Sequence, residues 1–297
     1  MSCVPGALVT LNVGGAREPV FCIHPSGGQV TAYLRFRSLL GDDQPLFAIQ
    51  SRALADPPRE HPTLERMAVD YATLVQSVSA DAHCQLLGWS LGGVIAFATA
   101  AELERRGTPV RTVGMIDAPR GSEAPTASDE TAFAASAAIA ESGGAAVAAD
   151  VIAAALPALA PDGVTAAVLL ARCEEGGLIL PGALTVDAFE SRLQLYRRHF
   201  ALLTAHRPPV LETTPVRQWW AKPPSAPFDW SSRARGGLYE RVLGGTHFSI
   251  MHPPHVEVIA ADLRAGHRAL AGTAARRSPP RTSSPASGSA GAEPRTR

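Results

Sequence analysis

Short apolar runs alternate with amphipathic helical patterns along the first 117 residues of the chain. After the second run, apolar residues recur at helical spacing from 64 to 78. Another helix is predicted after Ser90, where good helix formers lead to two arginines and a terminating Gly107. This alternation predicts an α/β fold, with a mostly parallel sheet and helices on both faces. The four runs, each typical of a buried strand, are PVFCIH at 19–24, LFAIQ at 46–50, CQLLGW at 84–89 and VRTVGMI at 110–116.

The strand pattern stops after Asp117, and from about 120 to 207 the chain is rich in alanine and helical in composition. Its clearest helix is predicted to start near Asp187 and carries an apolar stripe from Phe189 to Leu203. An insertion of this length exceeds an ordinary connection, so we interpret it as a helical lid. The alternative is a pair of ordinary helices that cover the sheet. Strand-like runs return at 215–221 and 238–243, and a last helix is predicted at 254–270.

We expect one domain over residues 1–271, with the lid inserted at about 120–207. The chain has 297 residues and 46% hydrophobic content, enough for one large core. Residues 272–297 are rich in Arg, Ser, Pro and Gly and cannot bury enough apolar area to offset the entropy lost on ordering. We therefore expect a disordered tail there.

Charge and cysteine content narrow the classes of function. Lys+Arg and Asp+Glu both number 27, so nothing indicates a nucleic-acid-binding or polybasic membrane protein. The N-terminus lacks the pattern of a secretory signal, and none of the four cysteines forms a CxxC pair. We expect a cytoplasmic protein with reduced thiols, no membrane span, no metal site and no redox cofactor.

The segment Gly88-Trp89-Ser90-Leu91-Gly92 fits the G-x-S-x-G pattern between a predicted strand and a predicted helix. In that context a sharp turn lifts the serine hydroxyl above the sheet, while the glycines leave room for the backbone and the substrate. The pattern predicts the α/β-hydrolase fold with Ser90 as nucleophile. The alternative is a tight turn with a passive serine.

A serine hydroxyl needs a general base, and the base needs a carboxylate that orients it. Asp117 ends the strand that follows the serine turn, although it could instead cap a turn. His247 follows the last predicted strand, where this fold presents its base. His252, His255 and His267 compete with it, but chain order and strand placement favour His247.

Acyl transfer also needs two N–H donors directed at the oxyanion of the tetrahedral intermediate. The amide of Leu91, next to the nucleophile, is one candidate, and the amide of Ser26 in the glycine-rich segment HPSGG is the other. A plain glycine turn is the alternative reading of that segment. His24, which opens it, is interpreted as a loop-shaping residue.

The segments LNVGGAREPVFCIHPSGG, GWSLGG, MIDAP and GGTHFSIM, in this order, resemble the thioesterase domains of nonribosomal peptide synthetases and polyketide synthases. The resemblance covers about 8–270 and is weak between 120 and 180. It implies that Ser90 attacks a thioester on the phosphopantetheine arm of an acyl or peptidyl carrier protein. Hydrolysis or macrocyclisation would then release the acyl chain. It also implies the triad Ser90, Asp117 and His247, oxyanion amides at Leu91 and Ser26, and no cofactor beyond the carrier's arm.

Two departures from the family pattern keep alternatives open. The module is expected to stand alone from Met1 with no carrier domain in front of it, and it carries an unusual tail rich in Arg, Ser and Pro. In addition, Trp89 stands where free-standing editing thioesterases usually have histidine. The chain is therefore expected to be a stand-alone releasing enzyme, an editing enzyme or a domain of a larger synthase. A hydrolase of free esters or amides and a non-catalytic carrier-binding protein are the remaining hypotheses.

Overall fold

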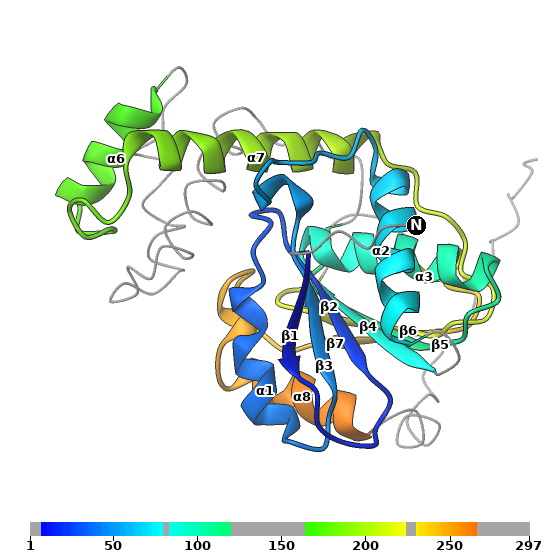
Figure 1. Cartoon of the computed structure of the whole chain (residues 1–297). Coiled ribbons are helices and arrows are strands. Elements are labelled where there is room, and N and C mark those ends of the chain that lie inside the picture. Colours follow the sequence, from blue (N-terminus) through cyan, green and yellow to red (C-terminus); the bar gives the residue numbers. More distant parts are fainter. Residues whose placement is uncertain (1–6, 80–82, 120–163, 224–229, 266–297) are drawn as a thin grey trace, which may run out of the picture. The chain divides into compact units, whose positions relative to one another are not determined.

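The structure is a computed structural model, and it describes residues 7–79, 83–119, 164–223 and 230–265. These residues contain a seven-stranded sheet in the order β1-β3-β2-β4-β5-β6-β7 (Figure 1). β1 pairs with β3 in antiparallel orientation, and every other pair is parallel. The strands are β1 Leu8–Asn12, β2 Val20–Ile23, β3 Leu46–Ile49, β4 Cys84–Trp89, β5 Val110–Ile116, β6 Val216–Trp220 and β7 Leu238–Val242.

Strands β2 to β7 lie within the six apolar runs of the sequence and confirm the predicted sheet. β1 was not predicted. It is an edge strand in which no residue is fully buried, and Thr10 and Asn12 interrupt its three apolar residues. A one-residue irregularity in its pairing lies between Thr10 and Asn12.

Helices cover both faces of the sheet, as predicted. Phe21 and Ile23 of β2 pack with helices α2 and α3, whereas Val20 and Cys22 of the same strand pack with α1 and α8. This alternation follows from the two-residue period of a strand. The helices are α1 Leu34–Leu40, α2 Leu64–Val78, α3 Leu91–Arg105, α6 Ala166–Glu175, α7 Val186–Ala205 and α8 His255–Ala265.

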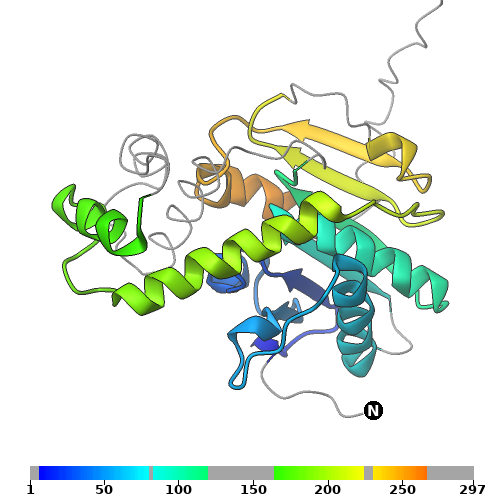
Figure 2. The same cartoon turned by 90° about the horizontal axis from the view of Figure 1, so that it is seen from above.

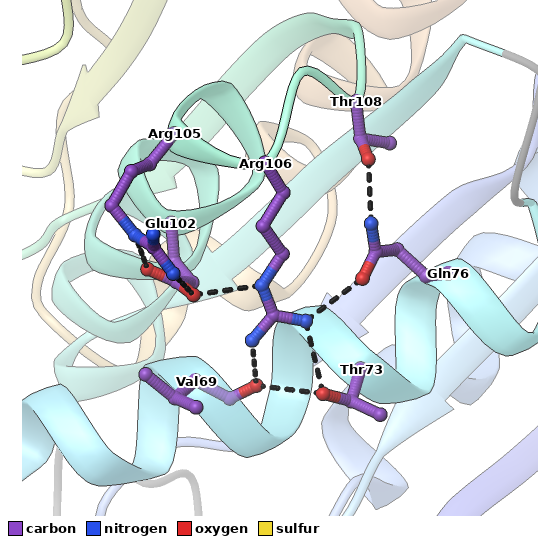
Figure 3. A network of polar contacts seen from close by, with 7 residues as sticks. All are labelled: Val69, Thr73, Gln76, Glu102, Arg105, Arg106 and Thr108. Carbon is purple, nitrogen blue, oxygen red and sulfur yellow. Dashed lines mark hydrogen bonds and ion pairs between the residues drawn. The ribbon is translucent and has the colours of Figure 1, made fainter.

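Helices α2 and α3 are joined by the guanidinium group of Arg106 (Figure 3). Its Nε donates to Glu102 Oε1 at 2.7 Å, and its Nη1 donates to Gln76 Oε1 at 2.8 Å. Its Nη2 donates to the carbonyl oxygen of Val69 at 2.9 Å. Arg106 thereby links the C-terminal end of α3 to the middle of α2, on the face of the sheet that both helices cover.

The described part of the predicted insertion consists of α6 and α7. The side chain of Thr185 caps α7 by accepting from the N–H of Ala188, so the helix begins slightly before the predicted Asp187. In Figure 1, α7 runs across the top of the sheet, and Figure 2 shows it crossing in front of the strands. The rest of the insertion, 120–163, lies outside the described residues, as does the predicted tail at 272–297.

Both tryptophans of β6 are packed in the interior. Trp219 lies on the α8 side and donates from Nε1 to Asp262 Oδ2 at 2.8 Å, whereas Trp220 lies on the opposite side with α2 and α3. Cys22, Cys84 and Cys173 are buried and free of disulfide bonds. Among the described helices, none is long and apolar enough to cross a membrane.

Candidate active site

Ser90 occupies the sharp turn between the end of β4 and the start of α3. Its backbone has φ 57° and ψ −130°, a region that non-glycine residues rarely adopt and that costs about 1–3 kcal/mol. Its N–H donates to the carbonyl oxygen of Ile116 at 2.8 Å, and its own carbonyl accepts from Gly93 at 2.9 Å. These two bonds hold the strained turn in place.

Glycines are required on both sides of this turn. A Cβ atom at Gly88 would lie 2.0 Å from the carbonyl oxygen of Gly92. A Cβ atom at Gly92 would lie 2.3 Å from the carbonyl oxygen of Ile23, at the end of β2. The glycines therefore let the first turn of α3 approach the backbone that leads into the segment 24–28.

Asp117 follows β5, the strand next to β4, and contacts His247 as the sequence indicates. Its Oδ2 lies 2.7 Å from His247 Nδ1, and its Oδ1 accepts from the N–H of Ala221 at 2.9 Å. Burial raises the pKa of Asp117, but the hydrogen bonds and charge of its neighbours outweigh this, so its pKa lies below the ordinary value. The carboxyl group is therefore ionised at neutral pH.

The ionised carboxylate fixes how the imidazole of His247 carries its proton. Only an N–H at Nδ1 can donate to Asp117, so in the neutral ring the lone pair is on Nε2. A general base accepts a proton at such a nitrogen. The pair therefore has the arrangement that activation of a hydroxyl nucleophile requires.

The residue before the serine also contacts this histidine. The indole ring of Trp89 stacks on the imidazole of His247, with ring centroids 5.3 Å apart and planes inclined by 30°. Its Nε1 donates to the carbonyl oxygen of His247 at 3.0 Å, and its backbone N–H donates to the hydroxyl of Tyr33 at 2.8 Å. Trp89 therefore joins the serine turn to the loop of the base, a contact that the sequence did not reveal.

The competing histidines lie elsewhere. His255 begins α8, where its ring would meet a Cβ atom built on Gly245, and His252 ends a short 3-10 turn. His267 lies outside the described residues. The histidine that meets the carboxylate of Asp117 is thus the one that chain order favoured.

Both candidate oxyanion donors belong to neighbouring backbone segments. Leu91 is the first residue of α3, and Ser26 lies in residues 24–28, which we call the oxyanion loop after the role expected for the Ser26 amide. The N–H of Gly28 donates to the carbonyl oxygen of Pro25 at 2.9 Å, which closes a turn, and both Leu91 and Ser26 are buried. The close approach at Gly92 brings the two segments together.

A buried polar cluster beside the oxyanion loop was missed by the sequence analysis. It contains His24, Tyr71, Ser51 and His199, and His199 belongs to α7. One sequence signal could have indicated it, because His199 falls on the buried face of α7 that the apolar stripe predicts. A buried imidazole must find hydrogen-bond partners, and here the partners lie on the oxyanion loop and after β3.

Comparison with known proteins identifies the family. The family model of the thioesterase domain matches residues 18–265. The chain belongs to the thioesterase domain family. A dimodular nonribosomal peptide synthase of Bacillus subtilis (strain 168) is 35% identical over 111 residues, which are 37% of this chain and 5% of that protein. The chain thus spans only a small part of this curated relative.

Solved structures show the same α/β-hydrolase fold. The Vlm2 thioesterase domain with a bound dodecadepsipeptide has a TM-score of 0.63 and 21% identity, covering 88% of this chain and 98% of that one. The RedJ thioesterase of prodiginine biosynthesis in Streptomyces coelicolor has a TM-score of 0.58 and 20% identity, covering 84% and 89%. The family and the fold that the sequence predicts are therefore confirmed.

Proposed function

We propose that this thioesterase domain releases an acyl or peptidyl chain from the phosphopantetheine thioester of a carrier protein through an acyl-Ser90 intermediate. The observation that carries the proposal is the contact between Asp117 and His247 beside the strained serine turn. Family membership supports the thioester as the bond that is cleaved. The relationship to nonribosomal peptide synthases supports a chain made on a carrier.

In the proposed acylation step, His247 Nε2 takes the proton of the Ser90 hydroxyl while the oxygen attacks the thioester carbonyl carbon. The amides of Leu91 and Ser26 donate to the oxyanion of the tetrahedral intermediate. Collapse of the intermediate breaks the carbon–sulfur bond, and the imidazolium gives its proton to the departing thiolate. Asp117 stabilises the imidazolium throughout.

In the proposed release step, His247 takes a proton from the second nucleophile. Water gives a free acid, whereas a hydroxyl or amine of the chain itself gives a macrocycle. The nucleophile attacks the ester carbonyl carbon of acyl-Ser90, and the same amides donate to the new tetrahedral intermediate. Its collapse breaks the bond between the acyl carbon and Ser90 Oγ, which takes the proton from the imidazolium. The two proposed steps use only side chains and backbone amides of the protein. We therefore propose no metal or cofactor beyond the carrier's own arm. We also propose a cytoplasmic site of action, which the free cysteines Cys22, Cys84 and Cys173 support.

The test is intact-protein mass spectrometry after incubation with a panel of acyl-pantetheine thioesters, with wild type beside Ser90→Ala. We expect an acyl adduct on wild type alone, and the mass of the released product distinguishes hydrolysis from cyclisation. Undiminished release by Ser90→Ala would refute the nucleophile. A large preference for simple esters over pantetheine thioesters would instead favour a free-ester hydrolase. Absence of any adduct or turnover would favour a non-catalytic carrier-binding role.

A further inference from the structure

Two successive carbonyl groups of the oxyanion loop are each held by an imidazole. The carbonyl oxygen of Pro25 lies 2.7 Å from His24 Nδ1, and that of Ser26 lies 2.7 Å from His199 Nδ1. The other ring nitrogens contact hydroxyl groups. Nε2 of His24 is 2.7 Å from the hydroxyl of Tyr71, and Nε2 of His199 is 3.3 Å from that of Ser51.

These partners define the proton positions. A carbonyl oxygen only accepts, so Nδ1 carries the proton in both rings, and each Nε2 accepts from its hydroxyl. The rings of His24 and His199 stack with centroids 5.2 Å apart and are buried. Burial and the neighbouring imidazole lower the pKa of His24 to about 3, and burial lowers that of His199 to about 4. Both rings are therefore neutral near pH 7, with one fixed donor each.

Fixing a carbonyl group also fixes the amide of the same peptide bond. In a planar trans peptide, C=O and N–H point in opposite directions. The bond from His24 to the Pro25 carbonyl thus directs the Ser26 N–H away from the His24 ring. The bond from His199 to the Ser26 carbonyl directs the Gly27 N–H away from the His199 ring. Ser26, the candidate oxyanion donor, is held on both sides.

We infer that His199 is a positioning residue, carried on α7, that orients the oxyanion loop for the reaction. The inference rests on the proposed function. His24 belongs to the loop that it holds, whereas His199 is separated from Ser26 by 173 positions in the sequence. The loop is thereby tied to the described part of the predicted lid. Ser51 strengthens this tie, because its N–H donates to the carbonyl of Gly28 at 2.9 Å while its hydroxyl meets His199.

Two substitutions separate the contacts of His199. His199→Asn places an amide nitrogen near the position of Nδ1 and can keep the bond to Ser26. His199→Gln extends the amide to near the position of Nε2, where its oxygen can accept from the Ser51 hydroxyl, while its nitrogen no longer matches the position of Nδ1 that donates to Ser26. His199→Phe keeps an aromatic ring at this position but leaves the Ser26 carbonyl without the Nδ1–H donor. We expect kcat for acylation to fall by about 10–100-fold in the Phe and Gln variants, since loss of an oxyanion donor costs up to about 10³. His199→Asn should recover most of the rate.

A second readout is specific to the oxyanion. A trifluoromethyl ketone analogue of the substrate forms a hemiketal with Ser90, and its oxyanion occupies the same position as that of the intermediate. Its inhibition constant should rise in parallel with the loss of kcat, while KM changes less than threefold. Leu203→Ala, a core position of the same helix, controls for destabilisation and should keep kcat and inhibitor affinity after correction for folded fraction.

The inference is overturned if His199→Phe is acylated at the wild-type rate. It is also overturned if all three His199 variants lose activity only in proportion to the Leu203→Ala control, with inhibitor affinity unchanged. These outcomes differ from failure of the proposed function, in which wild type itself forms no acyl-Ser90 adduct.

Discussion

Replacing Gly92 with alanine tests whether the serine turn depends on close backbone approach. The new Cβ atom would lie 2.3 Å from the carbonyl oxygen of Ile23 and 2.8 Å from that of His24. Both are backbone atoms at the end of β2, so neither can rotate away as a side chain does. The first turn of α3 must therefore move, and Ser90 and the Leu91 amide move with it.

The structure sets the size of the effect. A carbon atom does not approach a carbonyl oxygen closer than about 3.0 Å, so α3 must shift by about 0.7 Å at Gly92. Misplacement of reacting groups by about 1 Å can cost about 100-fold in rate. Overpacking costs about 1–3 kcal/mol, but alanine favours a helix over glycine by about 1 kcal/mol. We expect kcat to fall by about 30–100-fold, while the free energy of unfolding falls by only about 0–2 kcal/mol.

The assay combines single-turnover acylation by a pantetheine thioester with urea unfolding. Gly176→Ala is the matched control, because Gly176 has φ −76° at the end of α6 and its Cβ atom would lie 3.2 Å from the nearest atom, a carbonyl oxygen. That variant should keep the wild-type rate. A Gly92→Ala protein that is acylated within threefold of the wild-type rate would show that the turn does not need this approach.

Three further predictions follow from the structure. Asp117→Asn should lower kcat by about 10³–10⁴-fold with little change in melting temperature near pH 7, because the imidazole loses the partner that fixes its proton at Nδ1. Pre-steady-state kinetics and calorimetry measure the two effects, and a loss of kcat below tenfold would contradict the prediction. Arg106→Ala should lower the free energy of unfolding by about 1–3 kcal/mol, because it removes hydrogen bonds between α3 and α2. Arg105→Ala, on the exposed side of α3, should leave the urea midpoint nearly unchanged. Equal midpoints for the two variants would show that the bonds of Arg106 to α2 do not stabilise the fold. The pKa values of His24, about 3, and His199, about 4, lie below the unfolded value of 6.5, so the stability they contribute is present above about pH 6.5 and is lost as the pH falls toward 4. The slope is up to about 1.4 kcal/mol per pH unit for each ring, and urea titrations at pH 7.5 and 5 should show a smaller loss in His199→Asn than in wild type.

Much of the fold could be predicted because the buried strands are continuous apolar runs. A strand covered on both faces has few polar positions, so β2, β4 and β5 stand out in the sequence. β1 is an edge strand with partly exposed positions, and Thr10 and Asn12 interrupt its three apolar residues, so it forms no continuous apolar run. The seven-residue helix α1 is likewise too short to give a clear helical period.

The contact between Asp117 and His247 could be predicted because parallel strands present their carboxyl ends at one edge of the sheet. Asp117 directly follows β5 and His247 lies on the loop after β7, so both reach that edge, whatever lies between the strands in sequence. The catalytic roles of the two residues stay predictions. No comparable rule of sheet topology predicts the contact between His199 and Ser26. A lone histidine on the buried face of a helix does not indicate which residue it will contact.

Residues placed by the sheet and residues placed by side-chain contacts are also held in different ways. The ladder of hydrogen bonds continues one residue past three strands, where His24, Ser90 and Asp117 donate to the carbonyls of Ile49, Ile116 and Trp219 at 3.1, 2.8 and 2.7 Å. Two of these residues have positive φ, Ser90 at 57° and Asp117 at 44°, and each such conformation costs about 1–3 kcal/mol. The sheet can hold this strain because each bond continues an already ordered strand.

The oxyanion loop lies one step further from the sheet. The backbone hydrogen bonds of the sheet do not continue past His24. The N–H of Ser26 must nevertheless keep a fixed direction to act as the proposed oxyanion donor. Side chains take over that task, with one imidazole from the loop and one from α7. The backbones of Ser90 and Asp117 are thus each held by a bond to the neighbouring strand, whereas the proposed oxyanion donor depends also on a side chain of α7. Loss of the bond from His199 to Ser26 should therefore impair stabilisation of the oxyanion before it disturbs the contact between Asp117 and His247.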